Sequence, residues 1–382
     1  MNNKKILTIL ALAISLTACA NINDNNKNEN TDKKALSQLN ENENSSNEDL
    51  EDQEVYDGLV KNEETLYDYF DTITIFSAYT KNNEDFHRLL SIFKDEMGVY
   101  HKLYNSYDNF DGVNNFSTIN EKAGIEPVKV DKKIIDLIKY SKEMYKLTDG
   151  KINIAMGSLL GLWHDYREMS INNPDKAAIP DKTELEQNSK HKNIDAIEID
   201  EKNSTVYIND KDVKIDIGAI GKGYAAKMIA QKLQEEGLEH GILSVGGDDV
   251  LIGTNPSSDD GLWRIAIQNP NLEDKENPYV DVISLRDSSI VTSGDYQRYF
   301  EVDGKRYHHI IDPDTMYPST KWKSVSVGLD DIALADTLST YLFIIDYEEG
   351  LKVAEKYGAS VMWIDHDGKM YKTDSWSKMS DD

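Results

Sequence analysis

The sequence predicts an α+β protein in which mixed sheets pack against helices, and three observations carry this prediction. Polar and apolar side chains alternate over residues 70–76, as in a half-buried strand. Apolar residues recur at helical spacing over residues 85–100 and 132–145. Short β-branched runs and helical patterns then follow to residue 344, without an internal repeat or a second linker. We therefore expect one globular body with room for two subdomains.

The later elements can be placed in order. We expect helices over residues 224–236 and 333–344, and Gly237 stands where a left-handed cap would end the first of them. The expected strands cover residues 196–200, 205–208, 213–217, 241–245, 250–252 and 324–327, and a strand-and-turn region covers residues 263–318. The folded domain is predicted to run from residue 66 to residue 376, with a tail at residues 377–382.

Length and charge exclude several classes of protein. With 382 residues the chain is too long for a peptide hormone or a disulfide-stapled mini-protein. Lys and Arg number 42 against 69 Asp and Glu, and the formal net charge of -27 would repel a nucleic-acid backbone. The single cysteine, Cys19, excludes an internal disulfide framework and a thiolate metal cluster.

The N-terminus is organised as a secretory signal. Lys4 and Lys5 precede an apolar run over residues 6–16, which is too short to cross about 30 Å of hydrocarbon. The Leu-Thr-Ala-Cys sequence that ends at Cys19 resembles the lipobox of bacterial lipoproteins, in which the cysteine is lipidated. We therefore expect a signal peptide at residues 1–18 and a lipid anchor on Cys19, which would hold the protein at the extracytoplasmic face of the cell membrane.

Residues 19–65 form the segment between this cysteine and the predicted domain. The segment is rich in Asn, Asp, Glu, Ser and Lys, and acidic side chains outnumber the lysines. Such a composition buries too little apolar surface to offset the conformational entropy of the chain. The segment is therefore predicted to be a disordered acidic tether.

The densest chemical motif covers residues 214–226, where a predicted strand enters a helix through a turn of small residues. Glycines and the free N–H groups of a helix start favour an anion, so Asp216 and Lys222 flank a candidate phosphate cradle. The motif is not a Walker loop, because Gly223 follows Lys222 where Ser or Thr is required. A Rossmann turn and a plain β–α connection are the alternatives. The Rossmann turn usually opens its domain, and the plain connection leaves Asp216 and Lys222 unexplained.

Two further blocks carry polar groups suited to catalysis. In residues 291–313, the pair His308 and His309 could bind a metal, transfer a proton or simply end a strand. Neighbours on a strand face opposite ways, which argues against one metal held by both. Further on, Asp336 and Thr340 share a helix face and offer oxygen ligands to Mg2+. A capping aspartate and a threonine bonded to its own turn would give the same pattern.

Taken in order, these blocks resemble the motifs of the ApbE family, the FAD:protein FMN transferases, from Phe70 to the C-terminal region. The matching segments are residues 70–72, 115–124, 148–163, 216–223, 244–247, 292–296, 309–313 and 335–340. The resemblance implies two α/β subdomains around a flavin cleft. It also implies an enzyme that transfers the FMN moiety of FAD to a threonine hydroxyl of an exported target protein and releases AMP.

The same resemblance implies roles for individual residues. His309 would be the catalytic group that transfers a proton. Mg2+ would be held by the main-chain oxygen of Ala219 and by the side chains of Asp336 and Thr340. The residues that would bind FAD are Phe70, Ile152, Asn153, Asp216, Lys222 and Ile311.

Three positions depart from the usual pattern of that family. Asn153 stands where Asp is frequent, Asp248 stands where Asn is common, and Met316 begins a Met-Tyr-Pro sequence in place of a Gly-x-Pro turn. The sequence contains no segment like the family's threonine acceptor motif, so the acceptor is expected to be a separate exported protein. An FAD pyrophosphatase and a flavin-binding or solute-binding lipoprotein without catalysis are the alternative functions. The metal pair and His309 argue against the second.

Overall fold

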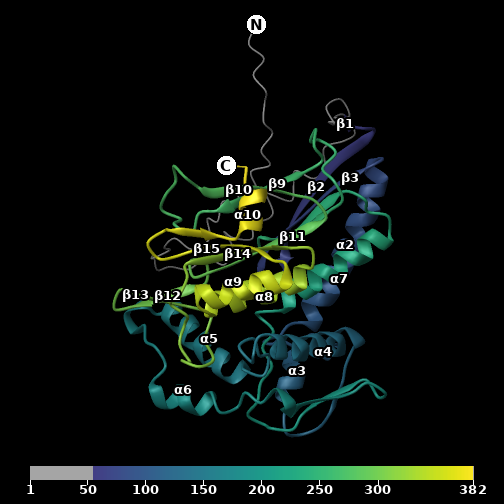
Figure 1. The fold of residues 1–382 in the computed structure, drawn as a ribbon. Coiled ribbons are helices and arrows are strands. Elements are labelled where there is room, and N and C mark those ends of the chain that lie inside the picture. Colours follow the sequence, from purple (N-terminus) through teal and green to yellow (C-terminus); the bar gives the residue numbers. More distant parts are fainter. Residues whose placement is uncertain (1–54, 382) are drawn as a thin grey trace, which may run out of the picture.

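The computed structural model describes residues 55–381, and its largest sheet has nine strands in the order β1-β2-β3-β7-β8-β11-β14-β15-β16 (Figure 1). Neighbouring strands of this sheet are antiparallel. The strands are β1 (Val55–Tyr56), β2 (Leu59–Tyr69), β3 (Thr72–Thr80), β7 (Gly241–Val245), β8 (Asp248–Ile252), β11 (Ser288–Gly294), β14 (Ser324–Leu329), β15 (Ser360–Ile364) and β16 (Met370–Lys372).

Helices cover one face of the large sheet and a two-stranded hairpin covers the other (Figure 1). The helices on the first face are α2 (Asn83–Leu103), α7 (Gly221–Glu235), α8 (Ile332–Ile344) and α9 (Tyr347–Tyr357). The second face is covered by β9 (Trp263–Gln268), β10 (Tyr279–Leu285) and the short helix α10 (Asp374–Met379). The central strands of the large sheet are therefore buried on both faces.

A smaller body surrounds a three-stranded sheet of order β4-β6-β5 (Figure 1). Its strands are β4 (Val128–Lys129), β5 (Ile197–Asp200) and β6 (Thr205–Ile208), and its helices are α3 (Phe116–Glu121), α4 (Lys132–Leu147), α5 (Gly157–Asn172) and α6 (Lys182–Asn188), with 3-10 turns at Pro174–Lys176 and Ile194–Ala196. A second hairpin, β12 (Tyr299–Val302) with β13 (Lys305–His308), packs on α5. The predicted mixed α and β fold is confirmed.

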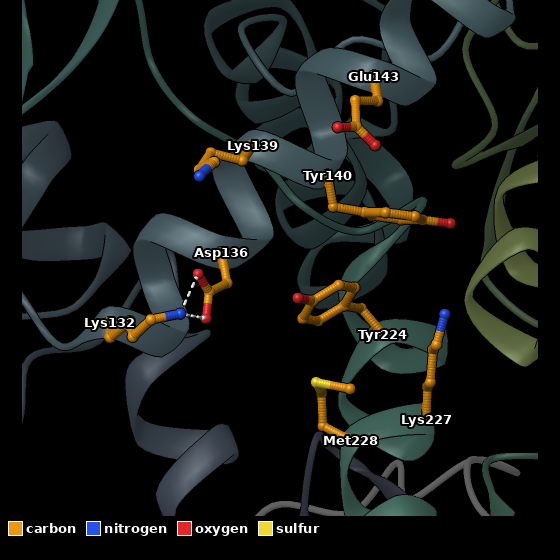
Figure 2. Close-up of a pocket in the computed structure, with 8 residues that line it drawn as sticks. All are labelled: Lys132, Asp136, Lys139, Tyr140, Glu143, Tyr224, Lys227 and Met228. Atoms are coloured by element: carbon orange, nitrogen blue, oxygen red, sulfur yellow. Dashed lines mark hydrogen bonds and ion pairs between the residues drawn. The ribbon is translucent and has the colours of Figure 1, made fainter. Parts of the chain in front are cut away.

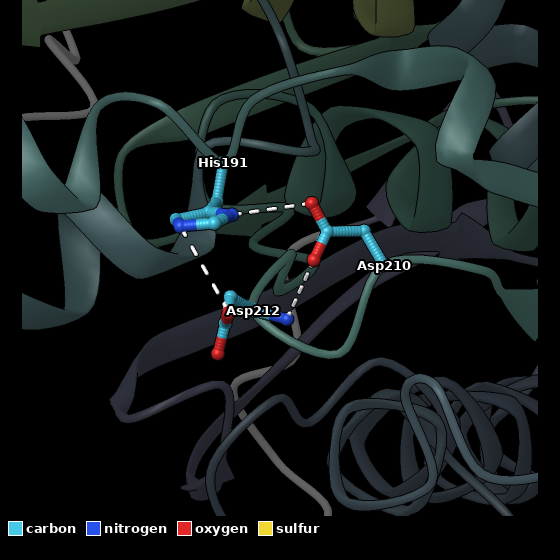
Figure 3. A group of neighbouring side chains, drawn as sticks. All are labelled: His191, Asp210 and Asp212. Carbon is cyan, nitrogen blue, oxygen red and sulfur yellow. Dashed lines mark hydrogen bonds and ion pairs between the residues drawn. The ribbon is translucent and has the colours of Figure 1, made fainter.

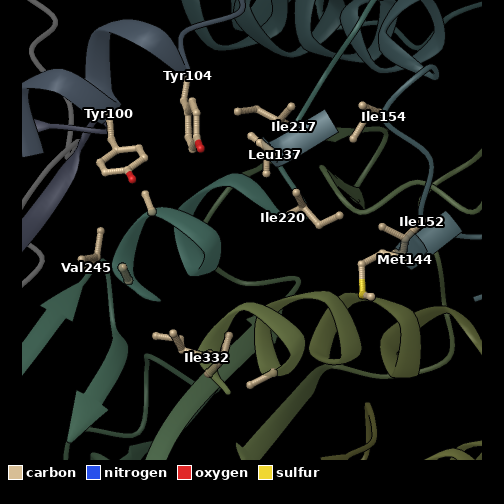
Figure 4. Close-up of a cluster of buried hydrophobic side chains, with 14 of the residues drawn as sticks. Tyr100, Tyr104, Leu137, Met144, Ile152, Ile154, Ile217, Ile220, Val245 and Ile332 are labelled. Atoms are coloured by element: carbon tan, nitrogen blue, oxygen red, sulfur yellow. The ribbon is translucent and has the colours of Figure 1, made fainter. Parts of the chain in front are cut away.

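The main hydrophobic core joins the two bodies around the first turn of α7 (Figure 4). Tyr104 just after α2, Leu137 of α4 and Ile220 just before α7 are buried there together with Val245 of β7 and Ile332 of α8. Segments far apart in the sequence thus fix the position of this turn. The start of α7 consequently has a rigid support.

The structure starts its strands earlier than the sequence predicted. Residues 55–65 were assigned to the disordered tether, but they lie in β1 and β2, and β2 pairs with β3 along its length. The strand was not predicted because its composition is acidic, like that of the tether. Since β2 lies near the edge of the sheet, it can carry charged side chains that contact water, such as Lys61, Glu63 and Glu64. Residues 1–54, which include the predicted signal peptide and Cys19, lie outside the described residues.

Two other boundaries need correction. The predicted tail at residues 377–382 includes the end of α10, and Ser380 donates a hydrogen bond of 2.7 Å to Asp281. The predicted strand at residues 213–217 is reduced to a single bridge between Lys214 and Met156, because this stretch runs beside the start of α5 and not beside a strand. Within residues 55–381, no helix is both long enough and apolar enough to span a membrane.

Phe70 also differs from its predicted place in a strand. Phe70 and Asp71 form the tight turn between β2 and β3, and both have left-handed backbones with φ of 53° and 51°. A left-handed backbone costs a residue other than glycine roughly 1–2 kcal/mol. The turn is held by the main-chain N–H of Phe70, which donates a hydrogen bond of 3.1 Å to Nδ1 of His101 on α2. The structure therefore supports a strained turn at this position.

Helices α7 and α8 approach each other closely at Gly223. A Cβ atom on Gly223 would lie 2.4 Å from Cβ of Asp336, which is far below van der Waals contact. We expect Gly223→Ala to destabilise the protein by about 1–3 kcal/mol, because the helices must separate to admit the methyl group. Urea unfolding measures this change.

Gly161 of α5 provides the matched control, because a Cβ atom added there meets no heavy atom within 4 Å. Gly161→Ala should raise the free energy of unfolding by about 0.5–1 kcal/mol, since alanine loses less backbone entropy in a helix. Equal effects of the two substitutions would contradict the close approach of α7 and α8.

Candidate functional site

Asp336 is buried at the first turn of α7, although it belongs to α8. Its Oδ2 accepts a hydrogen bond of 2.8 Å from the main-chain N–H of Gly223, and the residue is only 5% exposed. Helix α8 is buried nearly all round, so Asp336 lies among apolar neighbours. A carboxylate is thereby held at the positive end of the α7 dipole.

Lys222 lies between two buried carboxylates. Its ammonium group forms an ion pair with Asp248, the first residue of β8, and its charge also acts on Asp336. Burial lowers the pKa of Lys222, but the charges of Asp248 and Asp336 more than offset this effect and raise its pKa above the ordinary value. Burial, together with the negative charge of Asp248, raises the pKa of Asp336 to about 7.

This arrangement suits a divalent cation. Asp248 and Asp336 supply up to two negative charges, whereas Lys222 supplies one positive charge. The surplus is negative and desolvated, and carboxylate oxygen is the ligand that Mg2+ prefers. The residues present at the junction of α7 and α8 therefore fit the metal that the sequence implied.

Thr340 follows Asp336 by one turn of α8, as the sequence predicted. Its Oγ1 lies 3.3 Å from Oγ of Ser293, and Ser293 also contacts Ser339 at 2.8 Å. Ser293 lies in β11, so these hydroxyl contacts join α8 to the sheet. Ala219 lies in the turn that leads into α7, one helical turn before Gly223.

Asp216 lies in the same turn region and is already partnered. Its Oδ1 accepts a hydrogen bond of 2.8 Å from Gly218, and its Oδ2 accepts one of 3.0 Å from the hydroxyl of Tyr107. The Tyr107 ring stacks on His164 of α5 with 4.7 Å between ring centroids. The sequence analysis missed Tyr107, because nothing in the pattern distinguishes it among 21 tyrosines.

The loop before α5 is shaped by Asn153. Its Oδ1 accepts a hydrogen bond from Ala155, and its Nδ2 donates one to the carbonyl of Lys192, both at 2.9 Å. Ile152 is buried in the main core. Asn153 therefore folds the loop with its side chain, and its predicted role toward FAD stays a prediction.

His308 and His309 face different surroundings, as expected for neighbours at the end of a strand. His308 is buried, and its Nε2 donates a hydrogen bond of 2.7 Å to the carbonyl of Ser319, while its Nδ1 accepts one of 3.2 Å from Ile310. His309 is exposed, and its Nδ1 lies 3.3 Å from the carbonyl oxygen of Arg298. The geometry offers no metal site shared by the two rings.

Although His309 is partly open to solvent, the protein atoms packed around its ring disfavour the charged form, and the positive charge of Arg298 adds to this effect; together they lower the pKa of His309 to about 3. The charge of Arg298 also acts on Lys222, and the charge of Arg167 acts on both His309 and Tyr107. His309, Lys222 and Asp216 are therefore parts of one electrostatic neighbourhood. Arg298 and Arg167 received no role in the sequence analysis.

Ile311 lies in a separate aromatic cluster beside this neighbourhood. It is 5% exposed and packs with Trp163 and Phe300. Nε1 of Trp163 donates a hydrogen bond of 2.9 Å to the carbonyl of Met316. Met316 has a φ of 67°, the left-handed backbone that favours the glycine it replaces. The cluster thus supports the altered turn.

Two further groups lie outside the predicted residues. His191, Asp210 and Asp212 place ligand atoms within 4.8 Å of one another, and Nδ1 of His191 lies 3.1 Å from Asp210 (Figure 3). A cavity of about 340 Å3 lies between α4 and α7, where the rings of Tyr140 and Tyr224 lie 5.0 Å apart (Figure 2). Neither group contains a residue predicted from the sequence to bind the metal or FAD.

A lysine and two buried carboxylates meet at the N-terminus of α7, and this arrangement suits a cation together with an anionic ligand. The model of the ApbE family matches residues 70–363. The chain therefore belongs to the ApbE family.

Known relatives agree with this assignment. The FAD:protein FMN transferase of Vibrio cholerae serotype O1 is 32% identical over 279 residues, which cover 72% of this chain and 77% of that protein. The enzyme of the same name from Treponema pallidum is 30% identical over 65% of this chain and 70% of its own length.

Solved structures show the same fold. The ApbE protein of Thermotoga maritima matches with a TM-score of 0.72 at 28% identity, over 84% of this chain and all of that chain. The flavin transferase ApbE of Vibrio cholerae matches with a TM-score of 0.68 at 26% identity, over 84% of this chain and 99% of that chain.

The buried His308 makes a prediction about stability and pH. Burial lowers its pKa to about 4, so the unfolded chain binds a proton more readily below its ordinary pKa of 6.5. The protein is therefore stabilised by neutral His308 above pH 6.5 and loses this contribution as the pH falls toward 4. Between pH 7 and pH 5 we expect His308 to account for a loss of about 2 kcal/mol.

Urea unfolding at the two pH values tests this expectation. His308→Gln should be less stable at pH 7, but its further loss on going to pH 5 should be smaller than that of the wild type by about 2 kcal/mol. His87→Gln, on the exposed side of α2, is the control and should keep the wild-type dependence. A His308→Gln profile parallel to that of the wild type would refute the assignment.

Proposed function

We propose that the chain is an Mg2+-dependent FAD:protein FMN transferase that joins FMN to a threonine hydroxyl of an exported protein and releases AMP. The junction of α7 and α8 carries the proposal, because a single place offers a lysine for phosphate and a carboxylate for the cation. Membership of the ApbE family and the names of the relatives give further support.

In this proposal the chain binds both halves of the pyrophosphate. Asp336, Thr340 and the main-chain oxygen of Ala219 would hold Mg2+, which neutralises charge on the transferring phosphoryl group when bound. Lys222 would contact a phosphate oxygen at the start of α7. Phe70, Ile152, Asn153, Asp216 and Ile311 would bind or shape the rest of the FAD site.

His309 would accept the proton of the threonine. Its Nδ1 lies against the carbonyl of Arg298, so Nδ1–H donates and Nε2 keeps the free lone pair. A pKa of about 3 keeps the ring neutral at physiological pH. The threonine oxygen bonds to the FMN phosphorus, the bond from this phosphorus to the AMP oxygen breaks, AMP leaves with the electron pair, and the threonine proton passes to Nε2.

We expect Asp336→Asn to reduce both FAD consumption and FMN transfer by about 100-fold or more, because the substitution removes a charged ligand of the cation. The assay combines the purified protein, FAD, Mg2+ and an exported protein with a threonine acceptor. Intact mass of the acceptor and released AMP are measured together.

Asp331→Asn is the matched control on the same helix. The side chain of Asp331 accepts hydrogen bonds from the main-chain N–H groups of Ala333 and Leu334, and asparagine caps a helix equally well. The variant also removes a part-exposed ion pair with Lys227, which contributes little, so it should keep wild-type activity. Release of FMN and AMP without a mass gain would favour the pyrophosphatase. FAD binding without turnover in the wild type would favour a flavin-binding lipoprotein and refute the enzyme.

We also propose that the protein is a lipoprotein anchored through Cys19 at the extracytoplasmic face of the cell membrane. The lipobox-like sequence before Cys19 supports this proposal. In a bacterial host, the wild-type chain should fractionate with membranes and its N-terminal peptide should begin at a lipidated Cys19. Cys19→Ala should abolish the lipid modification. A wild-type N-terminal peptide that still begins at Met1, with unmodified Cys19, would contradict the anchor.

A further inference from the structure

Asp248 is the one residue at the junction whose role neither the motifs nor the proposed function explains. It is 2% exposed, and its carboxylate forms an ion pair with the ammonium group of Lys222. Its charge also acts on the buried Asp336. Asp248 therefore interacts with the residue proposed for the phosphate and with the residue proposed for the metal.

The two interactions have opposite consequences for ligands. A phosphate oxygen that approaches Lys222 competes with the carboxylate of Asp248 for the same ammonium group. A divalent cation beside Asp336 is attracted by the additional negative charge of Asp248, and the low dielectric of a buried site strengthens this attraction. The same carboxylate thus opposes the anionic ligand and favours the cation.

We propose that Asp248 is a positioning residue that makes FAD binding depend on the metal: it holds Lys222 back from the pyrophosphate until a divalent cation takes up the negative charge of the two carboxylates. The inference rests on the proposed function of the site. Once the cation is bound, the attraction of Asp248 for Lys222 is partly offset, and the ammonium group is released to the phosphate. Binding of either ligand then favours binding of the other.

Asp248→Asn separates these effects, because asparagine keeps the shape of the side chain and removes its charge. In the full-length protein without FAD, titration calorimetry should show Mg2+ binding weakened by about 10- to 100-fold. In the presence of EDTA, quenching of flavin fluorescence should show FAD binding tightened by about 5-fold or more, because Lys222 is freed. A general loss of structure would weaken both ligands and cannot produce opposite shifts.

Asp249→Asn is the matched control on the next residue of β8. Asp249 is also buried, with a pKa raised to about 6 by its burial, and it points to the other face of the strand, where it pairs with Ser244. This variant should leave both affinities within about 2-fold of the wild type. In a Lys222→Met background, Asp248→Asn should no longer tighten FAD binding, since the competing ammonium group is absent.

The outcomes distinguish this inference from the proposed function. Opposite shifts in a wild type that transfers no FMN would support the role of Asp248 and refute the transferase. Unchanged affinities in Asp248→Asn, or shifts of both ligands in the same direction, would refute the role of Asp248 even in an active transferase. A wild type that binds neither Mg2+ nor FAD would refute both.

Discussion

The close contact between α7 and α8 is the constraint on which the rest of the site depends. Only a residue without a side chain at position 223 allows the carboxylate of Asp336 to reach the main-chain N–H of that residue in the first turn of α7. Lys222 precedes this glycine and is therefore held beside the same carboxylate. The anion-binding end of one helix and the acidic side chain of the other meet because the helices touch there.

The nine-stranded sheet supports these helices. Two sequence motifs meet at its turns, namely the turn between β7 and β8 and the turn between β2 and β3. Gly246 has a φ of 67°, and a Cβ atom on it would lie 2.5 Å from Oγ1 of Thr72. The turn between β7 and β8 thus packs directly against the turn that carries Phe70. Asp248 begins β8 immediately after this contact, so its carboxylate is aimed by the strand and not by a loop.

Periodicity predicted the long helices and the central strands, because their buried faces require apolar residues at a regular spacing in the sequence. It failed at β2, whose exposed charged side chains resemble a tether, and at Phe70, whose left-handed turn depends on His101 from a distant helix. The motifs predicted the neighbourhood of Lys222 and Asp336. They could not predict the partners Tyr107 and Arg298, because Tyr107 meets Asp216 and Arg298 meets Lys222 only after segments distant in the sequence come together.

The buried charges explain why this site is costly without ligands. Two carboxylates lie away from water beside the partly buried Lys222, and desolvation of the surplus charge is only partly offset by the ion pair of Lys222 with Asp248. A cation that binds the folded chain removes this surplus and stabilises the fold by mass action. The same charges govern the stability of the fold and the binding of ligands, so Asp248 links the two. An uncharged residue at this position would reduce the stabilisation that a bound cation gives to the fold, and it would leave Lys222 free to bind phosphate.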